Sequence, residues 1–233
     1  MKVIEKEELR KLMLGPLRGN VGNLTARVIN GKIILSRRPL KYNVSNSAAA
    51  IKGRKIFAVA GSIAHKVVTL PMLCNCWKRT LKKGLSVQNY VTQLNYKRSP
   101  VDRPAISNII TPPDGFPLNM ISTAAGENML NVSIGPIERS VPLSGNEKGY
   151  ILNGLLCYYN PVNPKDKLYT ITTIEHPFEI NNVSQPVFLE ISLNDEQKNI
   201  SARYGNAIIY LALVVLDGDG CVLGYSATFA QES

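Results

Sequence analysis

The apolar segment Ala207–Leu216, AIIYLALVVL, restricts the possible folds of this chain more than any other stretch. It is about half the length that a helix needs to cross a bilayer, so it does not predict a membrane span. A short and continuous apolar run bounded by turn residues is typical of a strand that is buried in a core. The sequence therefore predicts a sheet with a fully buried strand close to the C-terminal end.

The rest of residues 105–233 alternates short apolar segments with turn residues, among them AAGEN and LDGDGC, which favour hairpins. About seven or eight short strands at this spacing predict an immunoglobulin-like antiparallel β-sandwich. The Cys…Trp…Cys pattern of true immunoglobulin domains is lacking, so the prediction concerns the architecture alone. The expected strands are Ala105–Thr111, Asn119–Ala124, Met129–Ile134, Tyr150–Tyr159, Leu168–Ile174, Val187–Leu193, Ala207–Leu216 and Cys221–Phe229.

Residues 1–104 predict a β-hairpin followed by about three helices. The hairpin turns at Asn30-Gly31, the dipeptide that best fits a type I′ turn, between Leu24–Ile29 and Lys32–Arg37. Apolar residues then recur at helical spacing, with Ser, Thr or Pro at the expected helix starts and Gly84 at one expected end. The expected helices cover residues 43–68, 69–84 and 86–97.

The first segment, Met1–Pro16, has acidic and basic residues where a secretory signal has an apolar region. We expect a short amphipathic helix there, which ends at Gly15-Pro16. Since no signal peptide is detected, the expected location is a virion or the host cytoplasm.

The segment RSPVDRPAI, Arg98–Ile106, contains two prolines and marks a change of composition from basic to acidic. We place a domain boundary there. The predicted fold class is α+β, with a basic hairpin-plus-helices domain at 1–104 and an acidic immunoglobulin-like β-sandwich domain at 105–233.

Charge is divided between the two halves of the chain. The net charge is +10, but residues 1–104 carry 21 Lys and Arg against 4 Asp and Glu, and residues 105–233 carry 6 against 13. Between Glu8 and Asp102 no carboxylate occurs, while 18 Lys or Arg lie in that interval. Ordinary surfaces mix both signs, so a partner of opposite charge is expected for this half.

Three kinds of partner could neutralise the basic half: nucleic acid, an anionic lipid or glycan surface, or the acidic half of another copy of the chain. A solvated basic face without a specific partner is the fourth possibility. The candidate polyanion-binding residues are Arg27, Lys32, Arg37, Arg38, Lys41, Lys52, Arg54, Lys55, Lys78, Arg79, Lys82, Lys83, Lys97 and Arg98.

Aromatic side chains next to these cations matter because nucleic-acid bases stack on them. Tyr42 and Tyr96 are the stacking candidates, whereas Trp77 is expected in the core. No RNA-recognition, zinc-finger or helix-turn-helix signature is present. Any nucleic-acid contact is therefore expected to involve backbone phosphates and to be independent of base sequence.

No set of residues indicates catalysis. Glu175-His176 is an isolated pair without a nucleophile motif. The spacing Cys74-Asn-Cys76 is too short for the usual zinc pattern and no second pair follows. We expect a protein that is not an enzyme, with no cofactor and no metal.

Several features together resemble a known family. They are GNVGN, a strand, Gly31-Lys32, Arg37–Pro39, a Ser/Ala-rich helix start with Arg54 and Phe57, a helix with a tryptophan, and the ending VLDGDGCVLGYS. This layout resembles an uncharacterised family of Bacteroidota proteins, although AAAIKGR lacks the glutamine that the family has before the helix arginine. The resemblance implies a Bacteroidota host or a phage of one. It implies no functional residues, because the family has no established activity.

We therefore expect a non-catalytic structural or assembly protein of a large multi-copy complex, in particular a phage virion component. Its basic half would contact nucleic acid or the acidic half of a neighbouring subunit. A sequence-independent nucleic-acid-binding protein and a cell-surface adhesion or glycan-binding module remain as alternatives. Expected partners are other copies of the chain or other subunits, with nucleic acid possible and no transmembrane segment.

Overall fold

The computed structural model describes residues 19–21, 24–29, 32–37, 44–126, 128–137, 147–180 and 182–233. It divides the chain into two units, Met1–Ser47 and Ala48–Ser233. The predicted helix within Met1–Pro16 lies outside the described residues. The elements are β1 Gly19–Val21, β2 Leu24–Ile29, β3 Lys32–Arg37, α2 Ala48–Thr69, α3 Pro71–Thr80, α4 Val87–Tyr96, β4 Met120–Ala125, β5 Met129–Ile134, β6 Gly149–Pro161, β7 Tyr169–Phe178, β8 Val187–Ser192, α5 Asp195–Ser201, β9 Tyr204–Leu216, β10 Val222–Tyr225 and β11 Phe229–Glu232.

The first unit contains a three-stranded antiparallel sheet in the order β1-β2-β3. β2 and β3 pair in a register that ends at Ile29 opposite Lys32, so two residues connect them. This is the spacing of a two-residue hairpin, although Asn30 and Gly31 themselves lie outside the described residues.

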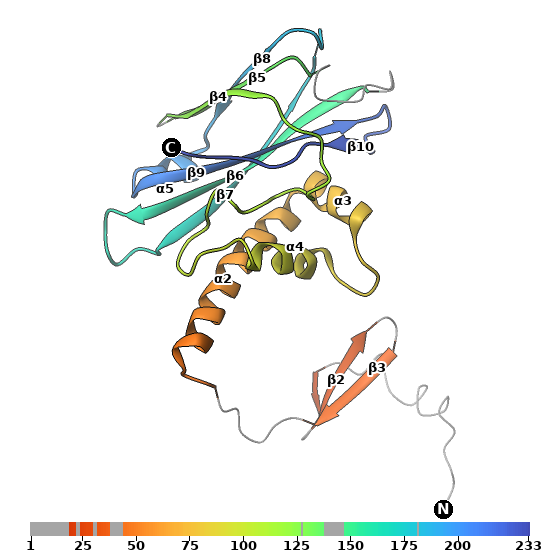
Figure 1. Ribbon diagram of the computed structural model, residues 1–233, viewed down its shortest axis with the longest axis vertical. Helices are drawn as coiled ribbons and strands as arrows, with labels where there is room; N and C mark the ends of the chain where they lie inside the picture. Colours follow the sequence, from red (N-terminus) through yellow and green to blue (C-terminus); the bar gives the residue numbers. More distant parts are fainter. Residues whose placement is uncertain are drawn as a thin grey trace, which may run out of the picture. The chain divides into compact units, whose positions relative to one another are not determined.

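The second unit has three layers, which Figure 1 shows from the side. Helices α2, α3 and α4 cover one face of a five-stranded sheet, in which β10-β9-β6-β7 lie in this order and β11 also pairs with β9. A three-stranded sheet, β4-β5-β8, packs on the opposite face. Because helices and antiparallel sheets share one unit, the fold class is α+β, as predicted.

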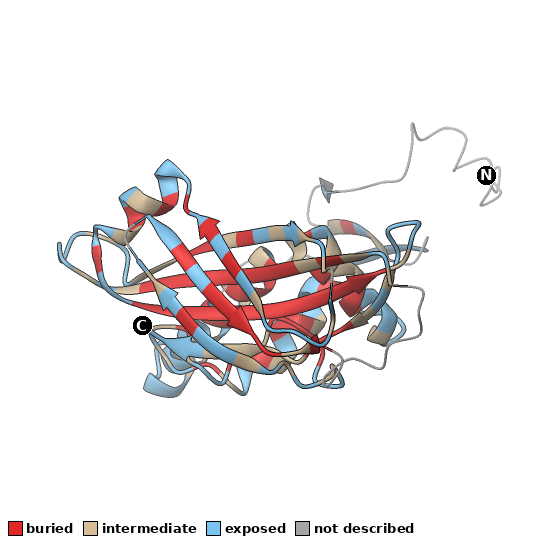
Figure 2. Ribbon diagram, turned by 90° about the horizontal axis from the view of Figure 1, so that it is seen from above, coloured by how far each residue is buried: buried red, intermediate tan, exposed pale blue. Residues whose placement is uncertain are grey.

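The two central strands explain why this arrangement needs layers on both sides. Side chains of β9 alternate between the two cores: Ile208 and Tyr210 face the helices, whereas Ile209 and Leu211 face the small sheet. Consequently Ala207–Leu216 is buried throughout, and Figure 2 shows the same continuous burial along the long strands. Burial of both faces is the reason for the unbroken apolar run in the sequence.

Local sequence signals position the three helices. Pro71 occupies the first turn of α3, where its missing N–H costs no hydrogen bond. The Ser86 side chain accepts a hydrogen bond of 3.2 Å from the Asn89 N–H and caps α4, as predicted. On α2 the buried positions include Val59, Ile63 and Val67, which recur at helical spacing.

The predicted strand Ala105–Thr111 is wrong, because this segment forms turns and irregular structure. Four of its backbone N–H groups, those of Ala105, Ile109, Ile110 and Thr111, donate to side chains and not to a neighbouring strand. The Ile109 N–H donates to Asn95 Oδ1 over 2.9 Å, and the N–H groups of Ile110 and Thr111 donate to Thr228 Oγ1. These bonds satisfy buried donors without a sheet ladder.

The predicted linker Arg98–Ile106 packs against the sheets. The Tyr210 hydroxyl donates to the Ala105 carbonyl over 2.7 Å, and the helices share one hydrophobic core with β6, β7 and β9. The division between the two compact units lies at Ser47/Ala48, earlier in the chain than the predicted boundary at 104/105. A helix absent from the predictions, α5, begins at the Asn194 cap.

In the described parts of the chain, no single helix is long and apolar enough to span a membrane. Helices α2 and α3 reach the required length and hydropathy only when taken as a pair, which is bent by 108°.

Candidate polyanion-binding site

The exposed side of α2, α3 and α4, here called the helical layer (residues 48–101), has a single sign of charge. No Asp or Glu occurs anywhere in this range. Exposed cations form two groups. One lies at the start of α2 and the end of α4, and the other lies at the end of α3 and before the start of α4. Because no carboxylate of the layer itself can neutralise them, this surface is the part of the second unit best suited to an anionic partner.

The first cluster of cations lies where the start of α2 meets the end of α4. Lys52, Arg54, Lys55 and Lys97 are exposed there. Lys55 Nζ lies 3.0 Å from Asp102 Oδ1, and both side chains are about half exposed. A pair as exposed as this one adds little stability, so Lys55 can exchange its partner at little cost.

A groove lies beside this cluster, between α2 and α4. Its volume is about 350 Å³, and it is lined by Phe57, Asn89, Thr92, Gln93, Tyr96 and Lys97. Phe57 is 60% exposed and Tyr96 is 40% exposed. Two aromatic side chains therefore lie open to solvent next to the cations.

The second cluster contains the cations at the end of α3 and just after it: Lys78, Arg79, Lys82 and Lys83. Arg79 Nη1 donates to the backbone carbonyls of Val222 and Leu223 over 2.9 and 3.0 Å, which ties α3 to β10. Lys82 Nζ lies 6.0 Å from the centroid of the Tyr90 ring. Lys78 and Lys83 are exposed.

The three cations of the first unit that the structure describes, Arg27, Lys32 and Arg37, lie on two faces of its small sheet. Residues directly opposite each other on paired strands share a face. Arg27 lies opposite Ile34 and Lys32 opposite Ile29, whereas Arg37 lies opposite Leu24 on the other face. The hairpin therefore does not gather its cations on one side.

The predicted sites are thus brought together only in part. The structure groups Lys52, Arg54, Lys55, Lys97 and Arg98 around the start of α2 and the end of α4. The remaining candidates Arg38, Lys41 and Tyr42 lie outside the described residues.

Of the aromatic candidates, Tyr96 is exposed and lines the groove. Trp77 is fully buried and donates its Nε1–H to the Ile110 carbonyl over 2.8 Å, so its prediction as a core residue is confirmed. Phe57 was not among the stacking candidates. Its signal in the sequence is its place off the buried stripe of α2 that runs through Val59, Ile63 and Val67.

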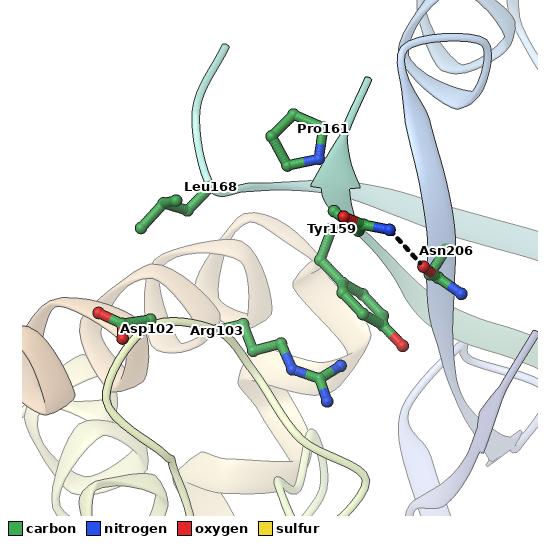
Figure 3. Close-up of a pocket in the computed structure, with 7 residues that line it drawn as sticks. Asp102, Arg103, Tyr159, Pro161, Leu168 and Asn206 are labelled. Atoms are coloured by element: carbon green, nitrogen blue, oxygen red, sulfur yellow. Dashed lines mark hydrogen bonds between the residues drawn. The ribbon is translucent and has the colours of Figure 1, made fainter. Parts of the chain in front are cut away.

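A second pocket, drawn in Figure 3, has a volume of about 440 Å³ and walls of mixed polarity, which include Pro161 and Leu168. The Arg103 guanidinium lies 4.1 Å from the centroid of the Tyr159 ring and pairs with Glu232 over 3.2 Å. Asn160 Nδ2 donates to Asn206 Oδ1 over 3.0 Å. The carboxylates of Asp102, which lines the pocket, and of Glu232, which pairs with Arg103, offset the single cation here, so this pocket does not extend the basic surface.

Glu175 and His176 do not form a site. As neighbours on β7 they point to opposite faces of the sheet, and His176 stacks on Phe178 with ring centroids 6.5 Å apart. Across the described residues, no three His, Cys, Asp or Glu side chains gather in a way that could hold a metal ion.

Two cysteines, Cys76 and Cys157, are fully buried. Burial raises the pKa of each thiol from 9.0 to about 12. Between these values the unfolded chain loses the thiol protons while the folded chain keeps them, so stability falls as pH rises. The difference corresponds to about 4 kcal/mol for each thiol at most.

We therefore expect the free energy of unfolding to fall steeply between pH 9 and 12, as measured by urea denaturation at a series of pH values. Cys76→Ala should flatten this fall, because the variant lacks one of the thiols that ionise on unfolding. The matched control is Cys221→Ala, which removes an exposed thiol and should leave the slope unchanged. Equal slopes for all three proteins would contradict the prediction.

No family model matches this chain, and searches of curated proteins and of solved structures find no match either.

Proposed function

We propose that this protein is a non-catalytic structural subunit of a multi-copy assembly, in particular a phage virion component, which contacts nucleic acid through its helical layer. One observation carries the proposal: residues 48–101 present exposed Lys and Arg side chains without a single carboxylate among them. The contact would be made to backbone phosphates and would not depend on base sequence.

The physical basis is the release of counterions. Phosphates hold a layer of condensed cations, and each Lys or Arg that neutralises a phosphate frees some of them into solution. Lys52 and Lys97 on one side of the helical layer and Lys78 and Lys83 on the other are exposed, so they can reach phosphates without rearrangement of the fold. Of these four, Lys78 also donates to Asn75 Oδ1 over 3.1 Å, an exposed hydrogen bond that a phosphate contact would replace.

A second candidate function is self-assembly by charge, in which the acidic part of a neighbouring copy takes the place of the phosphates. It is favoured by the 13 Asp and Glu in residues 105–233, of which Asp195 is almost fully exposed. Contacts between two different surfaces of identical chains build rings or filaments. In the same proposal, the two facing antiparallel sheets are the immunoglobulin-like part of the subunit.

The test is a titration of duplex DNA binding against salt concentration. The logarithm of the association constant should fall linearly with the logarithm of salt concentration, with a slope of about −0.9 for each phosphate contact, so that five contacts give about −4.5. Two duplexes of unrelated sequence should bind equally. A slope near zero, or no binding at 50 mM salt, would refute the proposed contact with nucleic acid.

A further inference from the structure

We infer that the groove between α2 and α4 is a stacking site for unpaired nucleic-acid bases, so that the helical layer prefers single strands to duplexes. The inference rests on the proposed function and narrows its substrate class. The juxtaposition that carries it is Phe57 and Tyr96 on the walls of one groove with Lys97 at its edge.

The two aromatic side chains come from different helices and are both open to solvent. They are 39 positions apart in the sequence, and only the packing of α2 on α4 brings them to one groove. The Tyr96 hydroxyl lies 3.4 Å from the position that a Cβ would take on Gly53, one turn before Phe57. A glycine at that position leaves the room in which Tyr96 lies against α2.

The remaining wall of the groove is one stripe along α4. Asn89, Thr92, Gln93 and Tyr96 follow at the spacing of neighbouring turns. The Thr92 hydroxyl already donates to the Gln88 carbonyl over 2.7 Å. The exposed amides of Asn89 and Gln93 can donate to and accept from the edges of a base that stacks on the aromatic rings.

Charge complementarity identifies the occupant. Lys97 lines the groove, and Lys52 and Arg54 flank Gly53, the residue of α2 beside the Tyr96 hydroxyl. The phosphates of a bound strand would lie against these cations. A channel with cations for the backbone and aromatic rings for the bases is the general pattern of single-strand binding. A duplex cannot use the rings, because its bases are stacked and paired inside the helix.

The test compares an oligonucleotide of 20 thymidines with a 20-base-pair duplex at the same salt concentration. Phe57→Ala and Tyr96→Ala should each weaken binding of the single strand about tenfold and leave duplex binding unchanged. Tyr96→Phe should keep the affinity, because it keeps the ring. The matched control is Phe188→Ala, which removes a side chain 76% exposed on β8, in the layer opposite the helices.

A second readout locates the contact. A single strand that carries 5-iodouracil should form a photochemical crosslink to the peptide that contains Phe57 or to the one that contains Tyr96. Adducts confined to other peptides would overturn the inference. So would equal loss of single-strand and duplex binding in the two alanine variants.

The outcomes separate the two proposals. Duplex binding with a steep salt slope, but no preference for single strands and no effect of Phe57→Ala, would overturn the stacking site and leave the proposed function standing. Absence of any nucleic-acid binding would overturn both. If sedimentation shows a dimer that Phe57→Ala dissociates, a second copy occupies the groove and the stacking site is likewise overturned.

Discussion

Replacement of Lys52, Lys78, Lys83 and Lys97 by alanine is expected to lower the affinity for duplex DNA by about a thousandfold or more at 0.1 M salt. Each of these side chains is exposed, and the four come from both clusters of the helical layer. If each lysine contacts one phosphate, loss of all four makes the salt slope shallower by about 3.6. At 0.1 M salt, the loss of one contact then lowers the association constant by a little under tenfold. The measurement is a fluorescence anisotropy titration at several salt concentrations.

The matched control removes the same charge from the other part of the unit. Lys148, Lys165, Lys167 and Arg203 are exposed and lie outside the helical layer. Their replacement by alanine should weaken binding far less, because it lowers the net charge without removing contacts. Equal losses in both quadruple variants would mean that binding follows net charge alone, and the helical layer would then not be the binding face.

Each of these substitutions replaces an exposed side chain and is expected to change the free energy of unfolding by less than about 0.5 kcal/mol, so both quadruple variants should stay folded. A loss of affinity can then be assigned to the missing contacts. If the helical-layer variant instead abolishes self-association and leaves nucleic-acid binding intact, the acidic part of a neighbouring copy is the partner.

Replacement of Trp77 by alanine is expected to lower the free energy of unfolding by about 4 kcal/mol or more. Trp77 is fully buried, its ring meets Tyr90 edge to face at 5.7 Å, and its Nε1–H donates to the Ile110 carbonyl. Loss of so large a core side chain costs about 3–5 kcal/mol. The carbonyl left without its donor adds about 1–3 kcal/mol.

The measurement is urea denaturation followed by far-ultraviolet circular dichroism, since the variant has no tryptophan left. Trp77→Phe serves as the control: it keeps much of the apolar contact and loses the hydrogen bond, so its effect should be clearly smaller. A change of less than about 1 kcal/mol for Trp77→Ala would contradict the packing described for this core.

The same experiment distinguishes a boundary at Ser47/Ala48, where the compact units divide, from the predicted boundary at 104/105. Trp77 belongs to the core that the helices share with β6, β7 and β9. The far-ultraviolet signal of the helices and the near-ultraviolet signal of the tyrosines, seven of the ten being in residues 105–233, should therefore be lost together. Helices that melt while this tyrosine signal persists would support a boundary at 104/105.

Local features of the fold follow from the sequence to a large extent. Strand β5 has the predicted bounds, and α4 begins after the predicted cap Ser86. Such features depend on neighbouring residues, through caps, turn geometry and the period of the apolar positions. The predicted strand at Ala105–Thr111 is wrong because its structure depends on residues far away in the chain. The backbone N–H groups of Ile110 and Thr111 donate to the Thr228 side chain.

The candidate site shows the same limit. The one-signed charge of residues 9–101 is a property of composition, and it was visible without any structure. The groove could not be predicted, because Phe57 and Tyr96 line the same groove only when α2 packs against α4. The two residues are 39 positions apart and belong to different helices. Helical periodicity relates side chains within one helix only, so no sequence pattern predicts that these two share a groove.

By itself, the sequence therefore determined most of the local elements, the buried central strand and the separation of charge along the chain. The tertiary structure alone decided that the helices cover a face of the large sheet, that the small sheet covers the other, and that two exposed aromatic side chains line one groove. The physical reason is that caps and turns depend on residues close together in the chain, and the charge of a segment depends on its composition alone. Layer packing depends on burial of apolar faces that are brought together from distant segments.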